Sequence, residues 1–144
     1  MDEAKRVLVQ EWLAKAYRDL CSAEKLGKDP QALLDTAIYH CQQAAEKAVK
    51  GFLVCRDRRF EKTHDVQVLV KSAAADEPRF NNWVEAGEVL TPYAVAYRYP
   101  AATALPSREE FDEALRLARD LFAFVLSLLP PEARPVGPPP SGNP

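Results

Sequence analysis

An alanine-rich apolar stripe between residues 34 and 52 constrains the fold more than any other feature of the sequence. Its members recur at spacings of three and four residues over about five turns, as on one face of an α-helix: Leu34, Ala37, Cys41, Ala44, Ala48 and Phe52. Such small side chains let a neighbouring helix approach closely. We therefore expect this segment to be a helix that packs in a bundle or at a dimer face.

Two helices are expected on either side of a turn near residue 27. Apolar residues at helical spacing predict a first helix over residues 4–26, and Gly27 is a typical C-terminal stop. Asp29 followed by Pro30 resembles an N-cap with proline at the first helical position. The second helix is therefore expected to begin there and to end before the charged residues 56–62.

Two shorter helices are expected in the middle of the chain. Thr63 can cap a helix that continues to residue 73. A further helix is expected over residues 80–95, and Pro92 should kink it or restart it, because proline cannot donate the helical hydrogen bond.

The last helix has the sequence pattern of a capping box. In such a box Ser107 accepts hydrogen bonds from backbone amides and Glu110 reaches back to the cap. We expect one domain over residues 1–129 and a disordered tail over residues 130–144, which are rich in proline and poor in apolar residues. The predicted fold class is all-α, an up-and-down bundle of about five helices.

Composition excludes several classes of protein. A net charge of −2 and a pI near 5.7 give no global reason for binding nucleic acid, so such binding would need a local patch. The three cysteines lack metal-ligand spacing, which predicts reduced thiols, a cytoplasmic protein, no metal and no cofactor. The charged residues after Met1 do not form a signal peptide, and no apolar run is long enough to span a membrane.

A polar face on the second helix allows two interpretations. Gln43, Glu46, Lys47 and Lys50 fall on adjacent faces, and Glu46 to Lys50 has the favourable orientation of a helical ion pair. The face is either solvated and merely stabilises the helix, or a ridge that binds a nucleotide, an RNA backbone or a partner helix. Spacing alone does not separate these alternatives.

Six cations gather around the end of the same helix: Lys47, Lys50, Arg56, Arg58, Arg59 and Lys62. They either compensate the helix dipole or form a phosphate-binding surface. His40 lies beside the apolar stripe, where we expect a partly buried, hydrogen-bonded ring rather than a ligand.

His64 follows the cations at a predicted helix N-terminus, where the helix dipole favours a neutral ring. A neutral histidine could act as the general base of a ribonuclease, with Arg58 or Arg59 stabilising the phosphorane charge. The alternative is a structural histidine that bonds a carbonyl of the preceding loop.

A cluster of aromatic residues and one arginine ends the fourth predicted helix: Tyr93, Tyr97, Arg98 and Tyr99. It is either an aromatic plug over the end of the bundle, with Arg98 paired to an acidic neighbour, or a site for a base and a phosphate.

Four segments together resemble the HEPN domain family: Arg18-Asp19-Leu20, residues 39–50 with the core Gln-Gln-Ala-Ala-Glu-Lys, Thr63-His64-Asp65-Val66 and Tyr97-Arg98-Tyr99-Pro100. The resemblance covers about residues 7–129. It implies a helical bundle that forms homodimers, and it suggests a minimal nucleotidyltransferase as partner in a toxin–antitoxin pair. Ribonuclease members carry an arginine and then a histidine late in the domain, whereas here no histidine follows Arg98.

The first hypothesis is therefore a non-catalytic, dimeric HEPN-type protein that binds a nucleotide, RNA or a nucleotidyltransferase. Its groove would be lined by Gln43, Lys47, Lys50, His64, Tyr97 and Arg98. One alternative is a metal-independent endoribonuclease that uses His64 with Arg58 or Arg59. Another is a purely structural scaffold for dimerisation.

Overall fold

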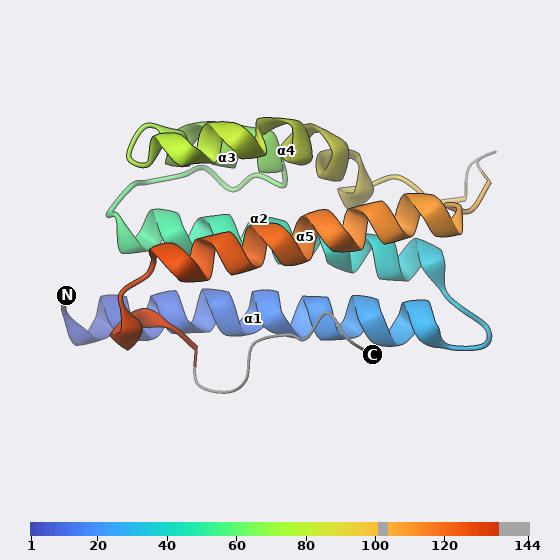
Figure 1. Cartoon of the computed structure of the whole chain (residues 1–144), viewed down its shortest axis with the longest axis horizontal. Coiled ribbons are helices and arrows are strands. Elements are labelled where there is room, and N and C mark those ends of the chain that lie inside the picture. Colours follow the sequence, from blue (N-terminus) through green and yellow to red (C-terminus); the bar gives the residue numbers. More distant parts are fainter. Residues whose placement is uncertain (101–103, 136–144) are drawn as a thin grey trace.

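A computed structural model of the chain describes residues 1–100 and 104–135 (Figure 1). Within these residues there are five α-helices, three short 3-10 helices and no strand, which confirms the predicted all-α class. The α-helices are α1 (Glu3–Lys28), α2 (Leu34–Cys55), α3 (Val66–Ala74), α4 (Val84–Leu90) and α5 (Arg108–Leu128). The 3-10 helices are η1 (Pro78–Trp83), η2 (Thr91–Ala94) and η3 (Pro131–Ala133).

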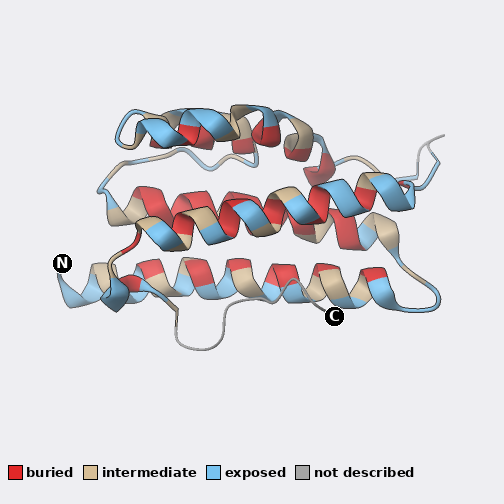
Figure 2. Cartoon of the chain, in the orientation of Figure 1, coloured by how far each residue is buried: buried red, intermediate tan, exposed pale blue. Residues whose placement is uncertain are grey.

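Helix α2 occupies the centre of the bundle. It lies between α1 on one side and the layer of α3 and α4 on the other, and both α2 and α5 run opposite to α1 (Figure 1). Its surface is buried over almost its whole length (Figure 2). Ala37, Ala44 and Ala48 are fully buried within this single chain, so the alanine stripe is a packing face of the bundle and is not free to form a dimer face.

Two glycines let α1 pack closely against its neighbours. An added Cβ at Gly51 of α2 would lie 2.1 Å from Leu13 Cδ2 of α1, and one at Gly27 would lie 2.5 Å from Phe111 Cε2 of α5. The expected helix stop at Gly27 is therefore wrong. The helix continues to Lys28, and the glycine is there because the Phe111 ring covers it.

The second helix begins later than the Asp29-Pro30 pattern predicts. Asp29 ends α1, and its Oδ1 accepts a hydrogen bond from the backbone N–H of Gln31 at 2.8 Å, which makes a local turn. Helix α2 begins only at Leu34, and its N-cap Leu33 provides no side-chain cap.

The caps of α3 and the shape of the fourth predicted helix also differ from expectation. Asp65, not Thr63, caps α3, because its Oδ1 accepts from the backbone N–H of Val68 at 3.0 Å. Thr63 instead accepts from the N–H of Asp65. Residues 78–94 form η1, α4 and η2 in succession rather than one kinked helix, and Pro92 lies in the first turn of η2.

The capping box at α5 is half formed. Ser107 Oγ accepts from the N–H of Glu110 at 3.0 Å, as predicted. The carboxylate of Glu110 does not reach back to the cap, because it accepts hydrogen bonds from Tyr93 and Tyr97.

The beginning of the predicted tail packs on the bundle. Ala133 in η3 is fully buried, and Gln10 Nε2 of α1 donates to the carbonyls of Glu132 and Arg134 at 3.0 and 3.2 Å. The expected disorder therefore does not extend to residues 131–134, while residues 136–144 lie outside the described residues. None of the helices described is long and apolar enough to cross a membrane.

Candidate functional site

The polar face of α2 is buried inside the bundle. Gln42, Gln43, Glu46 and Lys50 are at most 8% exposed. The chain can bury these groups because each finds a hydrogen-bonding partner, as buried polar groups must. The expectation of a solvated or ligand-facing ridge is therefore wrong for Gln43, Glu46 and Lys50, because the fold buries all three.

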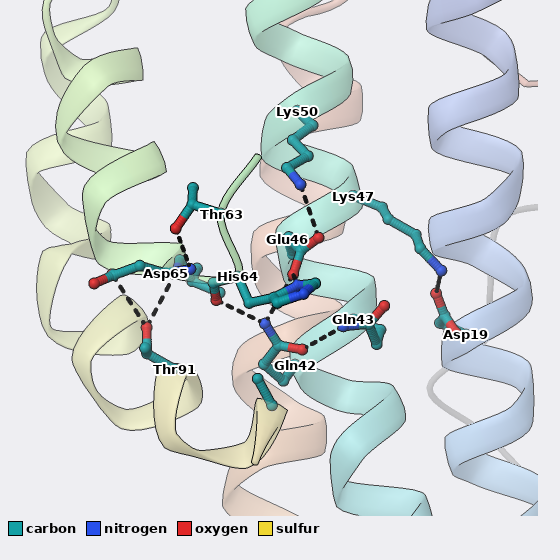
Figure 3. Close-up of polar contacts among 12 residues, drawn as sticks. Asp19, Gln42, Gln43, Glu46, Lys47, Lys50, Thr63, His64, Asp65 and Thr91 are labelled. Atoms are coloured by element: carbon teal, nitrogen blue, oxygen red, sulfur yellow. Dashed lines mark hydrogen bonds and ion pairs between the residues drawn. The ribbon is translucent and has the colours of Figure 1, made fainter. Parts of the chain in front are cut away.

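Glu46 is the centre of this buried cluster (Figure 3). Its carboxylate accepts from Lys50 Nζ at 2.9 Å, Gln42 Nε2 at 3.1 Å and His64 Nδ1 at 2.8 Å. Gln43 Nε2 extends the cluster by donating to Gln42 Oε1 at 2.7 Å. Burial raises the pKa of Glu46, but the hydrogen bonds from Lys50, His64 and Gln42 outweigh it and leave the pKa below its ordinary value.

Lys50 is enclosed by aromatic rings as well as by its ion pair. Its Nζ lies 5.7 Å from the centroid of Trp12 in α1 and 5.6 Å from that of Phe60 in the loop after α2. A cation between ring faces gains electrostatic stabilisation. Lys50 therefore links α1, α2 and the 56–65 loop, and it is not available to bind a phosphate.

His64 fixes the 56–65 loop to α2. Its backbone carbonyl accepts from Gln42 Nε2 at 2.9 Å while its ring bonds Glu46, so the predicted bond to a loop carbonyl is replaced by one to a carboxylate. The ring remains 71% exposed.

No contact among the described residues joins His64 to the arginines of the predicted ribonuclease site. Arg58 Nη1 pairs with Asp76 Oδ1 at 3.2 Å, and Arg59 is exposed in the loop. The six cations therefore do not form one phosphate-binding surface, because Lys47, Lys50 and Arg58 are each paired with a carboxylate.

A second cluster is centred on Asp19 of α1. Its Oδ1 lies 2.8 Å from His40 Nδ1 and its Oδ2 accepts from Lys47 Nζ at 2.7 Å, so the predicted hydrogen-bonded role of His40 is confirmed. Asp19 was absent from the predicted site residues. The sequence does contain a pattern that indicates this role. Asp19 occupies a position of the apolar stripe of α1 between Ala16 and Ala23, where burying a carboxylate without a partner would be costly.

An open pocket of about 280 Å³ lies next to the Asp19 cluster, where the first half of α2 meets the segment after η2. It is lined by Asp35, Thr36, Tyr39, His40, Tyr97 and Arg98. Since Nδ1 of His40 is bonded to Asp19, Nε2 is the ring nitrogen left to contact a molecule in the pocket.

Arg98 and Asp35 are the charged residues that line this pocket. The guanidinium carbon of Arg98 lies 4.1 Å from the ring centroid of Tyr39 and 5.6 Å from that of Tyr99, and Nη1 donates to the carbonyl of Ala94 at 2.8 Å. Arg98 makes no ion pair with any carboxylate in the described part of the chain. The expected pairing with an acidic neighbour is therefore not seen, and the charge is available to an anion.

Tyr97, the residue before Arg98, is itself fixed by its backbone conformation and by a hydrogen bond. Its φ of 69° is in the left-handed region, which is uncommon for an aromatic residue and often accompanies a functional constraint. Its hydroxyl donates to Glu110 Oε1 at 3.0 Å, beside that of Tyr93, which donates to Oε2 at 2.7 Å. Burial and the bond to Glu110 raise the pKa of Tyr93, and the bond to Glu110 raises the pKa of Tyr97, so both hydroxyls remain donors at neutral pH.

The predicted groove thus separates into three places. Gln43, Lys50 and His64 belong to the Glu46 cluster, and Lys47 belongs to the Asp19 cluster. Tyr97 and Arg98 line the open pocket. Across the described ranges, no group of three or more histidine, cysteine or carboxylate side chains is placed to hold a metal ion.

Comparisons with known proteins identify one family and two solved structures with a similar fold. The sequence matches the HEPN domain model over residues 9–128. TT1696 from Thermus thermophilus, whose crystal structure is known, shares 32% sequence identity with this chain. The two structures superpose with a TM-score of 0.68, and the match covers 84% of this chain and 98% of that chain. ST0689, an archaeal HEPN homologue, shares the fold at 24% identity and a TM-score of 0.65, over 83% and 95% of the two chains. A search of curated proteins gave no match.

Proposed function

Because the chain belongs to the HEPN domain family, we propose that it is a non-catalytic binding protein that takes a nucleotide or one residue of an RNA strand in the Arg98 pocket. The observation that carries this proposal is a guanidinium stacked on Tyr39 without a carboxylate partner among the described residues. An arginine held in this way can receive a phosphate through its outer edge.

The aromatic residues and His40 in the lining suit the same ligand, whereas the carboxylate of Asp35 favours placing the phosphate at Arg98, away from it. Tyrosine and arginine faces stack on bases of any sequence, and His40 Nε2 adds a polar contact beside them. A volume of about 280 Å³ is close to the small end of ligand sites, about 300 Å³, which fits a single nucleotide rather than a folded RNA.

The proposal also covers assembly and cellular role. We propose a cytoplasmic homodimer that works with a minimal nucleotidyltransferase in a toxin–antitoxin type of pair, and family membership is what supports this part. Light scattering of the purified protein would show twice the monomer mass. Co-expression with a nucleotidyltransferase encoded beside it would yield a complex that survives gel filtration. A monomer that binds no such enzyme would contradict this part alone.

Fluorescence anisotropy with a labelled mononucleotide and a labelled single-stranded RNA tests the pocket. Arg98→Ala should weaken binding about 5- to 150-fold, because a stacked base is worth about 1–3 kcal/mol. Arg98→Lys should not restore it, since an ammonium cannot stack or form a fork to a phosphate. The matched control is Lys62→Ala, which removes an exposed loop cation. Equal affinity of Arg98→Ala and wild-type protein for both probes would exclude the pocket.

A further inference from the structure

A second hollow lies on the outer side of α1, far along the chain from the Arg98 pocket. This α1 groove has a volume of about 540 Å³ and is lined by Leu8, Glu11, Trp12, Ala14, Lys15 and Arg18. Leu8 is 44% exposed within it, although leucine is a residue that folding normally covers. Nothing in the proposed nucleotide site uses this surface.

Trp12 gives the α1 groove a specific chemistry. One side of the indole contacts Lys50 and Phe60, which fixes the ring against the bundle. Its N–H has no partner among the described residues, and it is not among the buried groups, so it is open to an acceptor from outside. A fixed indole with a free N–H is the kind of surface that proline-rich polyproline II segments bind.

The chain carries such a segment shortly after Glu132 and Arg134, whose carbonyls contact Gln10 of α1. Residues 136–144 include Pro138, Pro139, Pro140 and Pro144. The described chain leads toward them in polyproline II geometry, since Arg134 has φ −76° and ψ 147°. Gln10 fixes this point on α1 by its bond to the carbonyl of Arg134.

The distances are compatible with docking within one molecule. Ala14 of the groove lies one turn beyond Gln10 on the same face of α1. Nine residues in polyproline II geometry extend about 28 Å. The groove residues from 8 to 18 cover about 15 Å of helix.

We propose that the proline-rich segment 136–144 binds in the α1 groove of its own chain as a polyproline II strand, with prolines on the face of Trp12 and a backbone carbonyl on its N–H. The segment has too little apolar content for a core of its own, whereas a fixed aromatic surface needs only a pre-ordered strand. This inference is independent of the proposed nucleotide site.

Quenching of tryptophan fluorescence by acrylamide tests the proposal on the full chain. Trp83→Phe leaves Trp12 as the one remaining tryptophan of the two in the sequence. In this background, Pro138→Gly with Pro139→Gly and Pro140→Gly should remove the protection of Trp12 from acrylamide, because glycine abolishes the polyproline II preference. Ser141→Gly, which keeps all the prolines, should retain the protection.

A second pair of variants addresses the groove itself. Leu8→Asp places a charge in the groove and should also remove the protection, whereas Val7→Asp, at an exposed neighbour that does not line it, should not. Circular dichroism confirms that each variant is folded. Equal quenching in the parent and the triple glycine variant would overturn the proposal. Protection that declines on dilution would also overturn it, because the strand would then come from a second copy.

Discussion

The Glu46 cluster and the Arg98 pocket lie along the same helix, but they differ in whether their charged side chains are paired. In the Glu46 cluster both charges of the Glu46–Lys50 pair are almost fully buried, and three donors satisfy the carboxylate. In the pocket, Arg98 has aromatic contacts and one carbonyl, and no carboxylate in the described residues neutralises it. A polar group that is fully partnered builds the fold, whereas one left partly unpartnered is available to a ligand.

The Asp19 cluster is intermediate between the two. Asp19 itself is 10% exposed, but its partners Lys47 and His40 are 24% and 26% exposed, and His40 also lines the pocket. Removing one charged group from each place should therefore give a graded series of effects on stability.

The largest effect is expected for Glu46→Ala. It leaves Lys50 buried without its counter-charge, and breaking a buried pair in this way costs about 3–5 kcal/mol. Urea denaturation measures the loss, with Glu61→Ala in the exposed part of the 56–65 loop as the control. A loss of only about 1 kcal/mol, typical of a surface pair, would mean that the cluster is open to water.

A smaller loss is expected for Asp19→Ala. Hydrogen bonds to charged groups contribute about 1.5–3 kcal/mol, and here both partners can turn toward solvent when the carboxylate is removed. The same denaturation experiment gives the value. If Asp19→Ala were more destabilising than Glu46→Ala, the ranking by burial would be wrong.

The acid response of Glu46 sharpens the comparison without removing a side chain. Because the folded-state pKa of Glu46 is below its ordinary value of 4.5, its ionised form stabilises the fold fully above that value. This stabilisation is lost as the pH falls through the lower, folded-state pKa. The difference in unfolding free energy between wild-type protein and Glu46→Gln should therefore shrink over that acid range. A difference that stays constant from neutral to acid pH would contradict the assigned hydrogen bonds.

The smallest effect is expected for Arg98→Ala. Exposed substitutions away from buried networks usually change stability by no more than about 0.5 kcal/mol. Thermal unfolding should thus be nearly unchanged in the variant whose ligand binding is expected to fail. A loss as large as that of Asp19→Ala would assign Arg98 to the fold and would favour the structural scaffold over a binding protein.

The sequence predicted the helices better than their ends. The spacing of the apolar stripe is sufficient to predict helix α2, because few structures other than a helix bury Ala37, Cys41, Ala44 and Ala48 together. The cap residues were harder to predict from the sequence. Thr63 and Asp65 both have side-chain oxygens that can accept from a backbone N–H, and only the local conformation of the backbone decides which of them caps the helix.

The site was less predictable than the fold because it depends on burial. Periodicity placed Gln43 and Lys50 on a polar face, but whether another element covers that face is a tertiary property. The pocket likewise joins Tyr39 to Arg98, which are far apart in the sequence. Asp19 was the informative exception, because a carboxylate within an apolar stripe signals a buried partner.

The bonds from Tyr93 and Tyr97 to Glu110 have a consequence for natural variation and for engineering. They hold the two ends of the connection between η2 and α5 together. The entropic cost of closing such a connection rises only slowly with its length, by about 0.6 kcal/mol for each doubling. Insertions between Arg98 and Ser107 should therefore leave the bundle intact. Related proteins could vary this connection freely and so alter what approaches Arg98 without rebuilding the helices, and a reporter peptide inserted there would be tolerated.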